Sequence, residues 1–328
     1  MRFSSADRHL IFIINLLYSV TEVCNQNDGR ITRLQQIQFE SISFSYDNAP
    51  ADTEDEESIS SCEQGIGDDS DEFEESSAQD TKPDMRKALC DFTFHFEAGK
   101  VYSIVGKNGS GKSTLVNILG KLYEPSEGQV LVNGIPLSNV PEATWTQNLV
   151  MVAQDQSFIW NGTVRDNIAF GLRNDQYSAV EDEAEACGVT EFVTTEAFLG
   201  DKERSLSLSG VELERWVDNF SGGQWKSIAL ARAFCRKATA SLFILDEPSA
   251  ALDPQKEYEL FERLRREREG RITIFISHRL QTCRASDCIL VMDGGRLVQS
   301  GSHKDLIKDE SGIYAELNRL QNEDWQDI

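Results

Sequence analysis

Long apolar runs are scarce in this sequence of 328 residues. The strongly apolar stretch LIFIINLLYSV, at residues 10–20, falls well short of the roughly 20 residues that a membrane-spanning helix needs. Arg2 and Arg8 precede it, as in a secretory signal, but no small-residue cleavage pattern follows. We therefore predict no transmembrane helix in this stretch and expect residues 1–36 to form a linker or helical lead-in to a folded domain.

Positive charge is also in short supply, because 32 Lys and Arg stand against 55 Asp and Glu, for a formal net charge of −23. Proteins that bind nucleic acid hold its phosphates with clusters of Lys and Arg, so we expect no nucleic-acid partner. The deficit is concentrated in residues 51–80, which contain thirteen acidic residues and no Lys or Arg. This stretch has too few large apolar side chains to offset its ordering entropy. We predict a disordered acidic insertion over residues 51–82.

Three roles stay open for this insertion. An inert, solvated spacer is the simplest, since long surface loops cost little closure entropy. Thr53, Ser60 and Ser77 each have an acidic residue three positions on, which would suit an acid-directed kinase and a regulatory role. A calcium site is the third, although the acids lack the regular alternation and the glycine of a known calcium loop.

Closely paired cysteines are missing as well, since the seven cysteines form no C-x-x-C pair. Their odd number and scatter fit a reducing compartment, without a disulfide framework or a zinc site. A metal site built from Cys283, Cys288 and a distant histidine is the one alternative that we weigh, and we assign none. The seven are Cys24, Cys62, Cys90, Cys187, Cys235, Cys283 and Cys288.

A phosphate-binding loop is the clearest motif present. In GKNGSGKST, at residues 106–114, Gly106 is followed after four residues by Gly111, Lys112 and Ser113, which matches G-x-x-x-x-G-K-[ST]. The strand-like VYSIV precedes it and the helix-like TLVNILGKLY follows, whereas a glycine-rich turn that binds nothing would not need this order. Lys112 would reach the β- and γ-phosphates and Ser113 would ligate Mg²⁺. The predicted nucleotide-binding residues here are Gly106, Asn108, Gly109, Ser110, Gly111, Lys112, Ser113 and Thr114.

A second nucleotide motif is SLFILDEPSAALD, at residues 241–253. Residues 241–245 read as a buried strand, so Asp246 and Glu247 fall at a strand end, where parallel α/β sheets bind ligands. We expect Asp246 to hold Mg²⁺ and Glu247 to accept a proton from an attacking water. Taken alone, the pair could also be an acidic strand cap without chemistry.

The stretch FSGGQWKSIALARAF, at residues 220–234, resembles the signature of the ATP-binding cassette (ABC) family. Small residues at a helix N-terminus form an anion site, and the resemblance implies that this subunit's own nucleotide cannot reach it. It therefore implies a head-to-tail dimer with a second ABC ATPase subunit, in which each signature closes over the other's nucleotide. The signature residues acting in trans are Ser221, Gly222, Gly223 and Gln224.

Four further residues resemble family positions. The resemblance implies that Tyr46 stacks on adenine, that Gln154 contacts Mg²⁺ and senses the membrane partner, and that His278 contacts the γ-phosphate beside the catalytic Lys112 and Glu247. It also places Asp253 in the loop that links the two sites. Alone, each has a plainer interpretation, such as core packing, a solvated turn or a helix cap, but their order around two phosphate motifs favours the functional one.

Two stretches resemble the exporter branch of the family. Residues 157–171 resemble the segment that receives a transmembrane partner, and residues 285–321 resemble the exporter ending. The absence of sustained heptads and of a second P-loop disfavours chromosome-type and translation-factor relatives. The resemblance implies an α/β fold over residues 37–322, with a P-loop core and mostly parallel sheet, an N-terminal antiparallel β part, an inserted helical subdomain at about 155–233 and a tail at 323–328.

The resemblance implies an ATP-binding and ATP-hydrolysing subunit or domain of an exporter, with ATP and Mg²⁺ as its ligands. It would act at the cytoplasmic face of a membrane, where a separate subunit or a missing membrane domain of the same chain supplies the transmembrane path. The alternative is a regulatory or non-transport module that loads ATP with little turnover. Intact Glu247 and His278 argue against that alternative.

Overall fold

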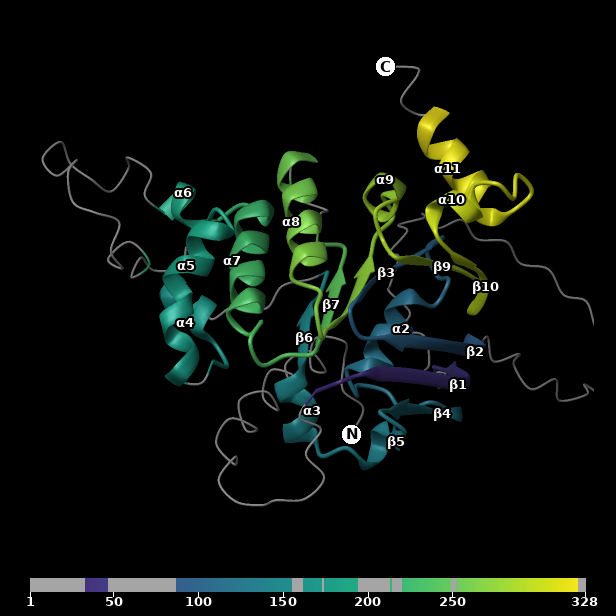
Figure 1. The fold of residues 1–328 in the computed structure, drawn as a ribbon, viewed down its shortest axis with the longest axis horizontal. Helices are drawn as coiled ribbons and strands as arrows, with labels where there is room; N and C mark the ends of the chain where they lie inside the picture. The colour runs from purple at the N-terminus through teal and green to yellow at the C-terminus, as the bar shows by residue number, and fades with distance from the viewer. Residues whose placement is uncertain are drawn as a thin grey trace, which may run out of the picture.

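The computed structural model describes residues 33–46, 87–154, 162–172, 174–193, 213, 220–248, 252 and 254–323. Two β-sheets and the helices around them make up this part of the chain (Figure 1). The apolar stretch at residues 10–20, the acidic insertion at 51–82 and Asp253 lie outside the described residues, so the predictions made for them stay predictions.

The first sheet is antiparallel and contains the beginning of the described chain. Its order is β2-β1-β4-β5, and β1 pairs antiparallel with both β2 and β4. Aromatic side chains fill its buried face: Phe39 packs edge-on against Phe92 and Phe96, with ring centroids 5.3 and 5.9 Å apart. The predicted N-terminal antiparallel β part is confirmed. Its strands are β1 (Gln36–Ser45), β2 (Lys87–Glu97), β4 (Glu127–Val132) and β5 (Ile135–Pro136).

The second sheet is mostly parallel, in the order β10-β9-β3-β8-β7-β6, and only its β10–β9 pair is antiparallel. Its central strands β7 and β8, LFILD and ITIFI, are buried at every position, as continuous apolar runs in parallel sheets are. The carboxyl ends of β3, β8 and β7 therefore lie side by side at one edge. The strands are β3 (Lys100–Gly106), β6 (Leu149–Val152), β7 (Leu242–Asp246), β8 (Ile272–Ile276), β9 (Cys288–Asp293) and β10 (Arg296–Gly301).

Helix α2 lies between the two sheets, in contact with both β2 and β3 (Figure 1). It follows the P-loop directly and buries Leu115, Val116, Ile118 and Leu119 in the core shared by the sheets. Helices α3, α8 and α10 contact strands of the parallel sheet, whereas η1 contacts β4 of the antiparallel sheet. The bounds are α2 (Lys112–Leu119), η1 (Leu137–Asn139), α3 (Glu142–Asn148), α8 (Pro254–Arg266), α9 (Leu280–Cys283), α10 (His303–Leu306) and α11 (Ile313–Glu323).

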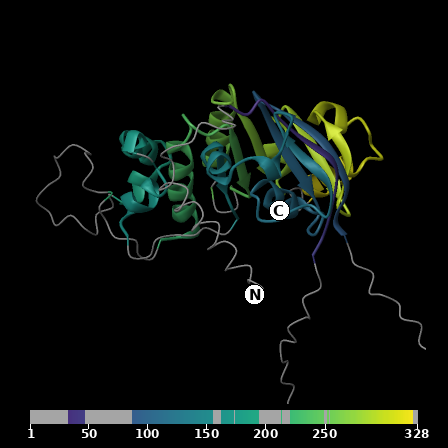
Figure 2. The same cartoon turned by 90° about the horizontal axis from the view of Figure 1, so that it is seen from below.

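A helical unit is inserted between β6 and β7. Helices α4, α5 and α6 stand together at one end of the molecule, and α7 lies between them and α8 (Figures 1 and 2). They share a separate core, in which Val164, Ile168, Val180 and Ile228 are fully buried. The inserted helical part of the predicted fold is thus present, while its predicted limits stay a prediction. Its elements are α4 (Val164–Ala169), η2 (Asn174–Ala179), α5 (Val180–Ala186), α6 (Val189–Val193) and α7 (Gly222–Cys235).

Candidate nucleotide-binding site

The loop between β3 and α2 has a backbone that only glycine fits at two positions. Gly106 and Gly111 have φ angles of 155° and 98°. A Cβ at Gly106 would lie 2.2 Å from the Met292 carbonyl oxygen, and one at Gly111 would lie 2.5 Å from the Ala88 carbonyl oxygen. Both contacts are with backbone and cannot be relieved by moving a side chain. The two motif glycines are therefore required to close the loop, independently of any ligand.

Lys112 is folded over this loop. Its ammonium donates hydrogen bonds to the carbonyl oxygens of Gly106 and Lys107, at 2.8 and 2.9 Å. Burial lowers the pKa of Lys112, while the negative charges of Asp246 and Glu247 act in the opposite direction. The P-loop lysine and the two acids thus share one site, although more than a hundred residues separate them in the chain.

The acid pair and the histidine meet where β7 and β8 end. Asp246 is the last residue of β7 and is buried. Glu247 follows in the left-handed region, at φ 45°, and its N–H donates to the Ile276 carbonyl oxygen at 2.9 Å. Its carboxylate oxygen Oε1 lies 3.2 Å from His278 Nδ1. A strained backbone of this kind persists only where its surroundings hold it, and here it aims the carboxylate at the histidine.

The oxygens predicted to bind Mg²⁺ are the hydroxyl of Ser113, the carboxylate of Asp246 and the amide of Gln154. Ser113 and Gln154 are exposed, at the start of α2 and just after β6. In the described part of the chain, no group of three or more His, Cys, Asp or Glu could hold a metal ion. Mg²⁺ takes oxygen ligands and is usually bound by one or two carboxylates together with substrate phosphates. The side-chain oxygens of these three residues are thus of the kind that Mg²⁺ takes as ligands.

Tyr46 reaches the phosphate loop from the antiparallel sheet. Its hydroxyl lies 2.9 Å from Thr114 Oγ1, across 68 positions of the chain. The ring packs edge-on against Phe44 and Tyr123, with centroids 5.0 and 5.5 Å away, and Tyr46 stays 46% exposed. The packing interpretation and the adenine-platform interpretation are thus compatible, because part of the residue packs while part remains open. Tyr123 was not expected from the sequence, which has no local pattern that links it to Tyr46.

The signature residues form the start of α7. Ser221 and Gln224 make a capping box, in which Ser221 Oγ accepts from the Gln224 N–H at 3.3 Å and Gln224 Oε1 accepts from the Ser221 N–H at 2.8 Å. Gly222 is exposed at this N-terminus and Gly223 is partly exposed. A helix start with small, exposed residues favours an anion from outside, so the geometry suits the role predicted for these four residues.

Lys226 connects the signature helix to the Gln154 segment, which sequence reasoning missed. Lys226 is buried, and its ammonium donates to the Ala153 carbonyl oxygen at 3.1 Å. A lysine at this position carried no signal beyond following the signature. The contact places the residue before Gln154 directly against α7.

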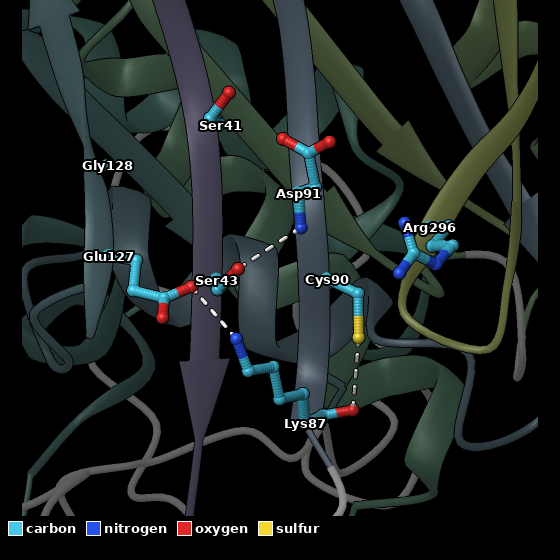
Figure 3. A pocket seen from close by; sticks show the side chains of 8 residues that line it. All are labelled: Ser41, Ser43, Lys87, Cys90, Asp91, Glu127, Gly128 and Arg296. Atoms are coloured by element: carbon cyan, nitrogen blue, oxygen red, sulfur yellow. Dashed lines mark hydrogen bonds and ion pairs between the residues drawn. The ribbon is translucent and has the colours of Figure 1, made fainter.

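A separate hollow of about 380 Å³ lies on the antiparallel sheet (Figure 3). Lys87 Nζ and Glu127 Oε2 form an ion pair across it at 2.8 Å, and the Asp91 N–H donates to Ser43 Oγ at 3.2 Å. Arg296 approaches from the β9–β10 turn. None of its lining residues belongs to the phosphate motifs, so this hollow is distinct from the nucleotide site.

A P-loop before a helix, an acid pair at a parallel strand end and a capped small-residue helix together define a P-loop nucleotide-binding protein of the cassette type. Residues 89–250 match the family model described as ABC transporter, and the chain belongs to this family. Within the described residues, no helix has the length and apolarity needed to cross a membrane.

The relatives that the chain matches are consistent with membership of this family. The chain is 37% identical over 238 residues to an ATP-dependent lipid A-core flippase of Yersinia pestis bv. Antiqua (strain Antiqua), covering 71% of this chain and 38% of the relative. It is 34% identical over 234 residues to one of Saccharophagus degradans, covering 71% and 38%. The chain thus spans about two fifths of these relatives' length.

A solved structure described as a bacterial Atm1-family ABC exporter with ATP bound has the same fold. It superimposes with a TM-score of 0.68 and 27% sequence identity. The match covers 92% of this chain and 44% of that chain. Similarity to the exporter branch therefore extends from sequence to structure.

Proposed function

We propose that this chain is the ATP-binding and ATP-hydrolysing part of an ABC exporter. The observation that carries the proposal is the 3.2 Å contact between Glu247 and His278, at the edge of the sheet from which the P-loop lysine also emerges. A module that binds ATP without hydrolysing it would not need a general base, Glu247, beside a residue proposed to contact the γ-phosphate, His278. The similarity to named flippases and to an exporter structure supports the export role.

Each residue has a defined part in the reaction. Backbone N–H groups of the P-loop and the Lys112 ammonium hold the β- and γ-phosphates. Ser113, Asp246 and Gln154 would hold Mg²⁺, which neutralises charge that develops on the phosphate oxygens. Glu247 accepts the proton of the attacking water, and His278 contacts the γ-phosphate beside it.

The site is completed by a second copy or a related ATPase subunit. At the N-terminus of α7, Ser221 and Gln224 form the capping box and Gly222 is exposed, and such a helix end suits an anion from outside. A head-to-tail dimer would bring the partner's nucleotide to it. Asp253 would then communicate between the two sites, and Tyr46 would stack on the adenine.

We further propose that the chain acts at the cytoplasmic face of a membrane, through a transmembrane domain or subunit that receives the segment after Gln154. The contact of Lys226 with Ala153 supports this, because a displacement of that segment would be transmitted through Lys226 to the signature helix α7.

Phosphate release from Mg-ATP, measured on the purified chain alongside nucleotide binding, tests the hydrolytic core of the proposal. We expect turnover to rise steeply with protein concentration, because the active form in this proposal is a dimer. We expect Lys112→Ala to abolish this turnover. ATP binding without turnover, at concentrations where dimers form, would instead support the regulatory module.

A further inference from the structure

The segment that carries His278 is a short loop between β8 and α9. The imidazole is 57% exposed, and its contact with Glu247 is 3.2 Å long. A side chain this open cannot be held by packing around its ring. Its position depends on whatever fixes the backbone of residues 277–280.

Gln321, in the last turn of α11, bonds to this backbone on both sides of the histidine. Its Nε2 amide donates to the His278 carbonyl oxygen, and its Oε1 accepts from the Leu280 N–H at 2.9 Å. One planar amide therefore serves one acceptor and one donor of the loop at once. A carboxylate of the same shape could only accept, so this pair of contacts selects glutamine.

The helix that carries Gln321 is firmly attached to the sheet. Tyr314 is fully buried, and its hydroxyl lies 2.8 Å from His303 Nδ1. Its N–H donates to Gln299 Oε1 at 3.0 Å. Leu317 packs against the cluster that contains Leu280 and Cys283 of α9, and α11 lies beside α9 in Figure 1. Gln321 is thus presented from a rigid support.

The other side of the loop is bonded to α8. Glu257 is buried and accepts hydrogen bonds from Arg279 Nη1, at 2.8 Å, and from the Thr282 hydroxyl. The Arg279 N–H in turn donates to Ser277 Oγ at 2.9 Å. Glu257 acts on side chains beyond the histidine, whereas Gln321 binds the carbonyl of the histidine itself.

We propose that Gln321 is a positioning residue for His278, so that the C-terminal helix sets where the imidazole faces Glu247 and the γ-phosphate. This inference rests on the proposed function. It assigns to α11 a part in hydrolysis, although Gln321 lies 43 positions from the histidine and belongs to neither nucleotide motif. Its effect acts through His278 and not by contact with ATP.

The test compares Gln321→Ala and Gln321→Glu with Asn318→Ala in the full chain. Asn318 lies one turn earlier on α11 and accepts from Arg284 Nη2 at 3.1 Å, away from the loop. We expect kcat of both Gln321 variants to fall roughly 5- to 30-fold, the effect of losing one or two hydrogen bonds. KM for ATP should change less than about twofold, and Asn318→Ala should keep wild-type kcat. Melting temperatures should match among the three variants.

A double-mutant cycle separates positioning from a general loss of structure. Adding Gln321→Ala to His278→Ala should cause no further loss, because the group being positioned is gone. Full additivity, or wild-type kcat in both Gln321 variants, would overturn the inference. Wild-type turnover of His278→Ala would contradict the proposed function of the histidine. An inactive His278→Ala together with an unaffected Gln321→Ala would contradict only the role of Gln321.

Discussion

Glu247→Gln is the most direct perturbation of the proposed chemistry. The amide keeps the shape of the side chain and its Oε1 can still face His278 Nδ1, which lies 3.2 Å from the carboxylate in the wild type. The backbone at φ 45° and its N–H bond to Ile276 do not involve the side chain and should be unaltered. The substitution therefore removes basicity and one negative charge while it leaves the site's geometry in place.

The expected loss follows from the role of a general base. Removing such a base commonly costs about 10²- to 10⁴-fold in rate, so we expect kcat to fall at least about 100-fold, or roughly 2.7 kcal/mol in activation free energy. ATP affinity should be kept or slightly improved, because one fewer carboxylate faces the phosphates. If the proposed dimer opens after hydrolysis, its closed form should also live longer in this variant.

The assay combines phosphate release with equilibrium binding of a fluorescent ATP analogue and with sedimentation in saturating Mg-ATP. Glu127→Gln is the matched control, because Glu127 lines the hollow on the antiparallel sheet, apart from the nucleotide site. Turnover of Glu247→Gln within about threefold of wild type would refute the assignment of Glu247 as the base. A variant that stays monomeric in saturating ATP would count against the closed pair.

Three further predictions concern other parts of the chain. Ser221→Arg should abolish hydrolysis, since a cation opposes the helix dipole; mixing it with inactive Lys112→Ala should restore some activity, and no recovery in verified mixed dimers would argue against assembly in trans. Tyr46→Ala should weaken ATP binding about 5- to 150-fold, as loss of 1–3 kcal/mol of base stacking would, while Tyr46→Phe should bind nearly as the wild type does; equal loss in both variants would point to the hydroxyl instead. Replacing residues 51–80 by a short Gly/Ser linker should leave ATP affinity and turnover almost unchanged at two salt concentrations, with slightly tighter binding at low salt; loss of ATPase activity would show that the acidic insertion is part of the enzyme.

The parts of this fold that could be predicted are those in which chemistry demands a local spacing. The glycines at 106 and 111 are needed because the loop backbone has no room for a Cβ. The buried apolar runs LFILD and ITIFI are typical of inner parallel strands. Both the antiparallel and the mostly parallel sheet were expected and are present. The roles of the site residues stay predictions, although the structure places Lys112, Asp246, Glu247 and His278 around one sheet edge.

The contacts that could not be predicted join residues far apart in the chain. Gln321 meets His278, Lys226 meets Ala153, and Glu257 meets Arg279 through single side chains that no periodicity marks. Each depends on how a helix docks on the sheet, which a single sequence does not reveal. Tyr46 is intermediate between the predictable and the unpredictable features. An aromatic residue at a strand end can either pack on the core or bind a ligand, and the sequence does not distinguish the two.

The position of β8 between two other strands of the parallel sheet has a consequence for when the site can act. It pairs with β3 on one side and β7 on the other, so the P-loop, the acid pair and the histidine segment emerge from three adjacent strands whose hydrogen bonds fix their separation. The strand ends from which these segments leave cannot move apart without breaking the sheet. If the chain hydrolyses ATP as proposed, the timing of hydrolysis would be set by parts outside that edge, such as the bound nucleotide, the proposed second subunit and helix α11, which bonds to the His278 loop.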